Sequence, residues 1–179
     1  MNKNNFIIQF GGLKDGVHYF VFEINKEFFD LIEYSELHNS SINLKVELIK
    51  NTTNLIFNFK FTGFVNLICD RCLDEFQHNI EFEEVLYIKF GEENQEIDAD
   101  LIVMKQGNTQ INLLEIIYQF IIVNLPIKKV HPNDKNANST CNTDMLNRIN
   151  GFDVENKSEQ EEILDSRWNE LKKLRNGTS

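Results

Sequence analysis

The stretch "LIFNFKFTGFVNLICDRC", Leu55 to Cys72, carries apolar residues at nearly every second position. The alternating apolar set is Leu55, Phe57, Phe59, Phe61, Val65, Leu67 and Cys69. Successive side chains of a β-strand point to opposite sides of the sheet, so this alternation is typical of a strand with one buried face. The stretch therefore predicts one long strand that ends in a Cys-x-x-Cys turn, and Gly63 within it predicts a β-bulge.

The segments on both sides of this strand alternate in the same way. The apolar positions are Ile42, Leu44, Val46 and Leu48 before it, and Phe76, Ile80, Phe82, Leu86, Ile88 and Phe90 after it. Three successive strands of this kind, joined by short turns, predict an antiparallel meander with one buried face. Cys69 and Cys72 then lie at the turn between the second and the third strand.

The remaining apolar segments predict an α+β domain around this meander. Further strands are expected over residues 6–10, 18–24 and 100–105, with an acidic loop over 91–100. One helix is expected over 25–37, with Asn25 as its N-cap. A second is expected from Leu113 to Leu125, where Asn112 and Glu115 have capping-box spacing and Pro126 follows. This second helix is apolar nearly all round, which predicts burial under the sheet.

The chain length and a change of composition predict the domain organisation. A chain of 179 residues fits one ordinary domain. We expect a single α+β domain over residues 1–141 and a polar, partly disordered tail over 142–179. Within the tail, Trp168, Leu171 and Leu174 recur at helical spacing, which predicts a short docking helix near 165–175.

The charge balance limits the partners that this chain can bind. The net formal charge is −10, with 28 acidic against 18 basic residues. Such a surface repels phosphate, which argues against general coating of nucleic acid and favours basic proteins as partners. The first residues lack a signal peptide, and no apolar run reaches the ~18 residues that would indicate a membrane span. A cytoplasmic protein with reduced thiols is therefore expected.

The three cysteines and one histidine predict a zinc site. Cys-x-x-Cys in a tight turn commonly supplies two thiolates to zinc, and two further ligands are then needed. His131 and Cys141 lie together in the polar segment after the second helix, which gives a candidate Cys₃His set with Cys69 and Cys72. Three other interpretations stay open: Cys69 could pack as a small apolar residue, His131 could be an ordinary loop histidine before Pro132, and the Cys-x-x-Cys could form a redox pair. The redox interpretation is weakened by the position of the motif in a β-hairpin instead of at a helix N-terminus.

The sequence contains none of the common enzyme motifs. Phosphate-binding glycine loops, a Gly-x-Ser-x-Gly elbow and a His-Glu-x-x-His pair are all missing from it. A non-catalytic protein is therefore expected, with a thiol-redox protein that uses Cys69 and Cys72, or a general zinc-stabilised interaction module, as the alternatives. At the exposed turn Arg71 is either a partner-binding side chain or half of a surface ion pair with Asp74.

Four features in order give the chain a family resemblance. They are "CDRCLDEF" after a long strand, the block "EIDADLIVMKQGNTQINLLEIIYQFIIVNLPIKKVHP", the later Cys141, and the closing "DSRWNELKKL". Together they resemble the YceD family, also called the domain-of-unknown-function 177 proteins, over about residues 28–174. This chain differs in having Ser166 where family members often carry proline, and in a longer interval between His131 and Cys141.

The resemblance implies a role in accumulation of large-subunit (23S) ribosomal RNA, and hence in ribosome assembly, without a known catalytic activity. Its cysteine pattern carries over to Cys69 and Cys72, and its later histidine and cysteine to His131 and Cys141. The expected partner is a ribosomal protein or a pre-large-subunit particle, with neither a membrane nor a small-molecule substrate involved. An acidic protein would mask the charge of a basic ribosomal protein before delivery.

Direct contact with ribosomal RNA would need a local basic patch. The candidate partner-binding residues are Arg71, Lys128, Lys129, Trp168, Lys172 and Lys173.

Overall fold

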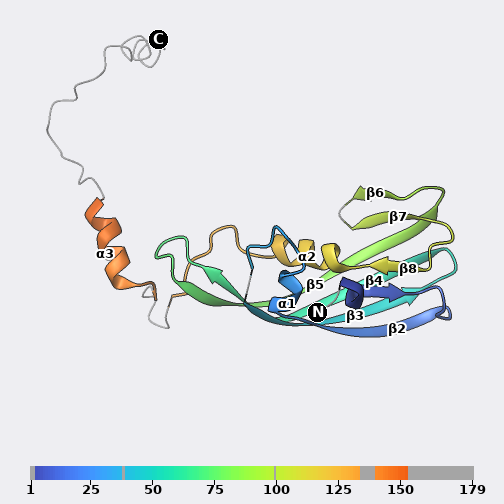
Figure 1. Ribbon diagram of the computed structural model, residues 1–179, viewed down its shortest axis with the longest axis horizontal. Coiled ribbons are helices and arrows are strands. Elements are labelled where there is room, and N and C mark those ends of the chain that lie inside the picture. The colour runs from blue at the N-terminus through green and yellow to red at the C-terminus, as the bar shows by residue number, and fades with distance from the viewer. Residues whose placement is uncertain (1–2, 38, 99, 134–139, 153–179) are drawn as a thin grey trace, which may run out of the picture. The chain divides into compact units, whose positions relative to one another are not determined.

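The protein is an α+β fold built mainly from antiparallel strands, as predicted (Figure 1). The structure is a computed structural model that describes residues 3–37, 39–98, 100–133 and 140–152. The elements in chain order are η1 (Lys3–Phe6), β1 (Ile7–Gln9), β2 (Gly16–Ile24), α1 (Lys26–Phe29), β3 (Ser40–Lys50), β4 (Asn54–Ile68), β5 (Glu75–Gly91), β6 (Gln95–Asp98), β7 (Leu101–Lys105), β8 (Gln110–Asn112), α2 (Leu114–Val123) and α3 (Thr143–Phe152). Across these residues no helix combines the length and the apolar character that crossing a membrane requires.

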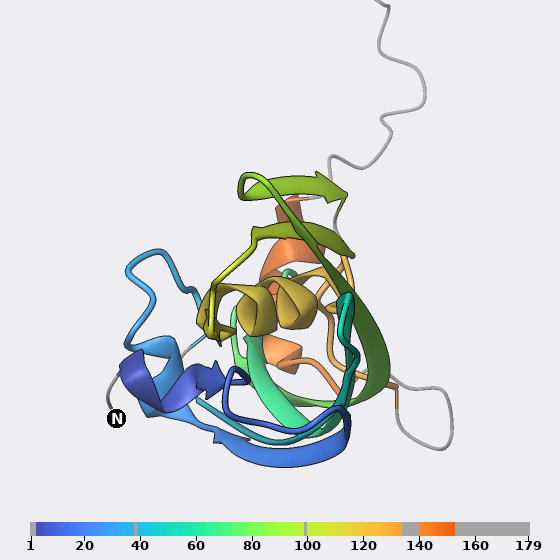
Figure 2. The same ribbon diagram turned by 90° about the vertical axis from the view of Figure 1, so that its right-hand side faces the viewer.

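The main sheet has six strands in the order β2-β3-β4-β5-β7-β6, and β1 pairs with β8 in a separate two-stranded sheet. The predicted meander forms its centre, because β3, β4 and β5 pair antiparallel in one continuous register. Figure 2 shows this sheet curving around α2. The alternating residues of β4 are buried, and Phe59 packs edge-on against Phe120 of α2 with ring centroids 5.2 Å apart. One face of the sheet therefore makes the core.

The long strand β4 is continuous at Gly63, so the predicted bulge is wrong. Gly63 pairs with Ile42 on one side and with Ile80 on the other, without a register shift. Its φ of +150° and the crowding of the neighbouring strand explain the glycine. A Cβ at this position would lie 2.2 Å from the carbonyl oxygen of Ser41. The glycine marks a close approach between two backbones.

The end of the sheet differs from the expectation for residues 91–105. The strand predicted over 100–105 exists as β7, but it pairs parallel with β5. Part of the expected acidic loop is strand β6, which pairs antiparallel with β7 and has a register irregularity between Glu96 and Asp98. Acidic side chains at the exposed edge of a sheet are compatible with a strand, because they discourage pairing with another chain.

Both predicted helices are shorter or less buried than expected. The helix expected over 25–37 is the single turn α1, with Asn25 Oδ1 accepting a hydrogen bond from Glu27 N–H at 3.0 Å. α2 has Leu113 as its N-cap, while Asn112 Oδ1 accepts a hydrogen bond from Leu114 N–H at 3.0 Å. Only one face of α2 is buried, and Val123 is 81% exposed. The expectation that α2 is buried because it is apolar nearly all round is therefore only partly correct.

The chain divides into two compact units between Asn142 and Thr143. The second unit begins with α3, which the sequence analysis did not predict and whose Met145 and Leu146 are half-buried. The helix expected near 165–175, with Trp168, lies outside the described residues. Whether residues 1–141 fold as an independent domain stays a prediction.

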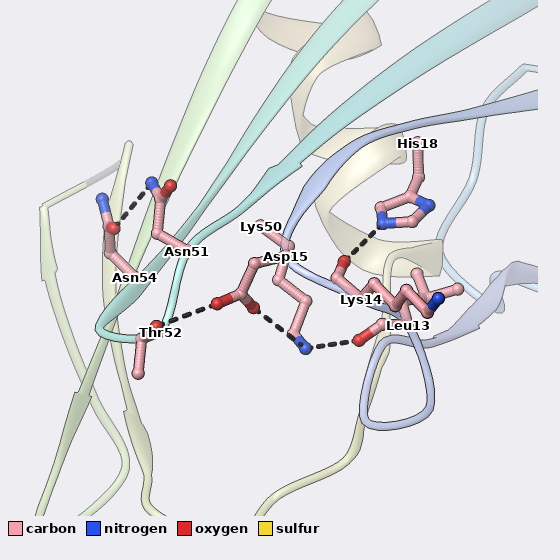
Figure 3. A network of polar contacts seen from close by, with 8 residues as sticks. All are labelled: Leu13, Lys14, Asp15, His18, Lys50, Asn51, Thr52 and Asn54. Carbon is pink, nitrogen blue, oxygen red and sulfur yellow. Dashed lines mark hydrogen bonds and ion pairs between the residues drawn. The ribbon is translucent and has the colours of Figure 1, made fainter.

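A network of polar contacts joins the loop after β1 to the β3–β4 turn (Figure 3). Lys50 Nζ donates to the carbonyl oxygen of Leu13 at 2.6 Å and lies 3.4 Å from Asp15 Oδ1. Thr52 Oγ1 donates to Asp15 Oδ2 at 2.8 Å. These contacts hold the turn at one end of β4, and the Cys-x-x-Cys turn lies at the other end.

Candidate metal centre

The Cys-x-x-Cys turn joins β4 to β5 and is closed by its own backbone. Cys69 N–H donates to the carbonyl oxygen of Asp74 at 3.0 Å, and Leu73 N–H donates to that of Cys69 at 2.9 Å. Arg71 N–H points at Cys69 Sγ, 3.4 Å away. The turn therefore presents Cys69 and Cys72 on its inner side, where their side chains are 0% and 1% exposed.

Leu73 occupies an unusual backbone conformation directly after the second cysteine. Its φ is +62°, which makes it the one non-glycine residue with positive φ among those described. A bulky side chain in the left-handed region costs roughly 1–2 kcal/mol. The side chain is also 66% exposed, so packing in the core does not offset this strain.

Two hydrogen bonds between Asp70 and Lys129 join the segment after α2 to the turn. Asp70 N–H donates to the carbonyl oxygen of Lys129 at 2.7 Å. In return Lys129 N–H donates to Asp70 Oδ2, also at 2.7 Å. This reciprocal pair fixes the chain two residues before His131, whose ring lies 4.9 Å from that of Phe76, centroid to centroid. Asp70 is therefore a positioning residue that the sequence analysis missed, and its place inside the Cys-x-x-Cys motif was the signal available.

The third cysteine, Cys141, lies beside Cys69 although it is far from it in the sequence. Cys141 is 4% exposed, and its Sγ lies 3.8 Å from that of Cys69. The neighbouring Asn142 donates from Nδ2 to Asp74 Oδ2 at 3.0 Å, which joins this stretch to the turn. No disulfide joins any two of these three cysteines.

The four predicted ligands converge closely enough for one metal ion. One ligand atom from each of Cys69, Cys72, His131 and Cys141 lies within 4.8 Å of the others. Cys72 Sγ and His131 Nδ1 are 3.4 Å apart. A tetrahedral ion with metal–sulfur bonds of about 2.3 Å requires sulfurs about 3.8 Å apart, as Cys69 and Cys141 are. The cluster could therefore hold a metal ion.

Backbone N–H groups favour the thiolate form of Cys69. Burial raises the pKa of this thiol, but hydrogen bonds from the N–H groups of Cys72, Arg71 and His131, with a further one from the His131 side chain, lower it to about 6. Oriented donors around a sulfur stabilise its negative charge, which a metal-bound thiolate also requires.

Cys72 has the opposite balance. Burial raises the pKa of its thiol, and the neighbouring sulfurs of Cys69 and Cys141 raise it further, although N–H groups of Asn142 and Asp74 point at its sulfur and lower it. Three clustered sulfurs cannot all be charged without a compensating cation. This is the electrostatic situation that a bound divalent ion resolves.

The predicted partner-binding residues differ in their surroundings, and some lie outside the described residues. Arg71 and Lys128 are exposed. Lys129 is held by Asp70 through its backbone, and its Nζ lies 3.9 Å from Glu36. Trp168, Lys172 and Lys173 lie outside the described residues.

Comparison with known proteins places the chain in a family. The model of the family "Large ribosomal RNA subunit accumulation protein YceD" matches residues 57–175. The chain therefore belongs to the YceD family, and membership implies a role in accumulation of large-subunit ribosomal RNA. The family is named for that role and not for an enzymatic reaction. No curated protein and no solved structure matches the chain.

Proposed function

We propose that this protein is a non-catalytic factor that supports 23S ribosomal RNA accumulation by binding a basic ribosomal protein during large-subunit assembly. Family membership supports the ribosomal role. The observation that carries the mechanism is the net charge of −10, which favours a basic protein over phosphate as the partner of most of the surface.

The metal in this proposal is a structural zinc ion. Three thiolates and one imidazole are a common closed donor set for tetrahedral zinc, and no position is then left for a substrate. The ion would be bound by Cys69 and Cys72 from the turn, by His131 and by Cys141. It would therefore join three separate parts of the chain, and its role is to hold the β4–β5 turn rigid.

A redox function is the second candidate, and the pKa of about 6 for Cys69 is the observation that favours it. Thiol exchange needs a thiolate that a substrate can reach. Cys69, Cys72 and Cys141 are at most 4% exposed, which disfavours attack on an external disulfide. A lowered thiol pKa also fits a metal ligand, so the structural role is preferred.

Metal analysis tests the zinc part of the proposal. Untagged protein should contain one zinc per chain, and His131→Ala should lose it. His131→Cys should keep zinc, because it replaces one ligand type by another. His78→Ala is the matched control, since His78 lies on β5 outside the cluster. Folded, metal-free wild-type protein that turns over a disulfide substrate would favour the redox candidate instead.

Affinity capture tests the ribosomal part. Tagged protein from growing cells should recover large-subunit ribosomal proteins or precursor particles, at low and at moderate salt. Retention of protein after the RNA is digested supports protein binding. Loss of all partners on RNA digestion would assign the contact to RNA, for which the exposed Lys128 and Arg71 are the candidates. Capture of neither would contradict the proposed function.

A chain truncated after Asn156 tests the proposed docking helix. Unchanged thermal stability with loss of the captured partner would assign Trp168, Lys172 and Lys173 to partner binding. A large fall in stability would assign Trp168 to packing within the protein.

A further inference from the structure

We propose that one continuous surface beside the metal centre is the docking site for a basic, apolar segment of a protein partner. This surface, called here the tip groove, runs from the β4–β5 turn to the end of α2. The inference rests on the proposed function, because it assigns that function's partner to a place on the molecule.

The tip groove consists of two hollows that share a wall. One hollow, of about 230 Å³, includes Ile68 at the end of β4 and Asp70 and Leu73 of the turn. The other, of about 540 Å³, includes residues from the C-terminal end of α2 and the chain after it. Glu36, Leu37 and Lys129 line both, so the two hollows form one surface.

Large apolar side chains are exposed along the whole tip groove. The exposed fractions are 58% for Ile68, 66% for Leu73, 64% for Tyr34, 39% for Ile122, 81% for Val123 and 103% for Ile127. Single exposed apolar residues are ordinary, but a contiguous series rimmed by charged groups is typical of an interaction site. The exposed C-terminal end of α2 therefore forms part of the tip groove. A docking role for this end explains why the helix is apolar on more than its buried face.

The conformation of Leu73 supports the docking site independently of the two hollows. Glycine or asparagine would adopt its φ of +62° with less strain. The leucine instead projects an apolar side chain into solvent from a turn that the four-residue cluster holds in place. A strained and exposed apolar side chain adds no core packing to the free protein. Contact with a partner gives it a role, since burial of a leucine at an interface is favourable.

The charges of the tip groove decide the chemistry of the occupant. Among the described residues that line it, the carboxylates of Glu36, Asp70 and Glu75 stand against the single cation of Lys129. That cation lies 3.9 Å from Glu36 and is partly neutralised by it. Phosphate is therefore repelled, whereas a segment with lysine or arginine beside apolar residues matches both features.

Binding of overlapping peptides from the large-subunit ribosomal proteins, followed by fluorescence anisotropy, tests this assignment. Leu73→Asn should weaken binding of the peptide that the wild type selects by about tenfold, because one interfacial leucine is lost. Leu73→Met should retain binding, since the side chain stays apolar. Ile127→Ser should weaken binding from the other end of the tip groove.

Two controls separate binding from folding. Leu73→Asn should keep the metal content and the thermal stability of the wild type, because asparagine tolerates the left-handed conformation. Val21→Thr removes an apolar side chain that is 62% exposed on β2, outside the tip groove, and should leave binding unchanged.

The outcomes distinguish this inference from the function on which it rests. A wild type that binds a ribosomal peptide, with Leu73→Asn and Ile127→Ser weakened, supports the tip groove. Equal binding by wild type and both variants overturns the tip groove but leaves the proposed function standing. A wild type that binds no ribosomal peptide, or binds only ribosomal RNA in the same assay, overturns both.

Discussion

The two turns at the ends of β4 are stabilised in opposite ways. The β3–β4 turn is held by several exposed or part-buried contacts, from Lys50 to Leu13 and Asp15 and from Thr52 to Asp15 (Figure 3). The β4–β5 turn carries the cluster formed by three buried cysteines, Cys69, Cys72 and Cys141, and the half-buried His131. The comparison indicates that stability is distributed at one end of the strand and concentrated at the other.

Metal removal should have the largest effect, and only at the β4–β5 turn. A strong chelator should lower the midpoint of thermal unfolding by more than about 10 °C, because a tightly bound ion stabilises the folded state by mass action. Cys72→Ser without chelator should give a similar curve. Hydrogen exchange should report loss of protection near Cys69 and His131 and unchanged protection near Thr52. Equal loss at both turns would contradict the proposed difference.

The next effect concerns the strand that joins the two turns. Gly63→Ala should destabilise the protein by about 3 kcal/mol, because its φ is +150° and a Cβ would meet the Ser41 carbonyl oxygen. Denaturant unfolding measures this difference. Gly12→Ala is the matched control, since nothing lies within 4 Å of a Cβ there. A Gly63→Ala variant as stable as the control would show that the two backbones can separate.

A smaller effect is expected from the contact that positions the segment after α2. Asp70→Ala should reduce stability by about 1 kcal/mol, because Lys129 N–H loses a charged acceptor. It should also weaken zinc retention against a competing chelator, since His131 is then less well placed. Thr52→Ala, which removes one contact of the β3–β4 turn, should lower stability by less and leave zinc retention unchanged. Unchanged zinc retention in Asp70→Ala would remove its positioning role.

The smallest effect is a pH dependence confined to the β3–β4 turn. The hydrogen bond from Thr52 lowers the pKa of Asp15 below its ordinary value of 3.8, and the nearby Lys50 lowers it further. The folded pKa is thus below the unfolded one. The contribution of Asp15 is therefore complete above 3.8 and is lost as the pH falls through its folded pKa. Comparison of wild type with Asp15→Asn across this range should give a small difference that vanishes in acid.

Sequence reasoning succeeded where the signal is local and repeated. The alternation from Leu55 to Leu67 predicted a strand with one buried face, and most alternating residues of β3, β4 and β5 lie in the core, while Phe82 and Phe90 are half-buried. Cys69 and Cys72 were recognisable as a pair because two residues separate them. His131 and Cys141 were candidates because the chain offers no other cysteine and few other histidines.

It failed where the outcome depends on neighbours that are distant in the chain. Gly63 resembled a bulge, yet its role is a close approach to β3. Residues 95–98 resembled a loop because they are acidic, and they form an edge strand only because β7 lies beside them. Val123 resembled a core residue of α2, although nothing in its own helix decides which face the sheet covers.

The sequence by itself determined the α+β class, the central meander and the identity of the four candidate ligands. Alternation, spacing and residue chemistry are properties of short segments and can be read from them directly. Only the tertiary structure decided that the Asp70–Lys129 pair brings His131 to the turn, that Leu73 is strained and exposed, and that α2 leaves one end uncovered. These features depend on contacts between segments far apart in the chain, and no local pattern encodes such distances.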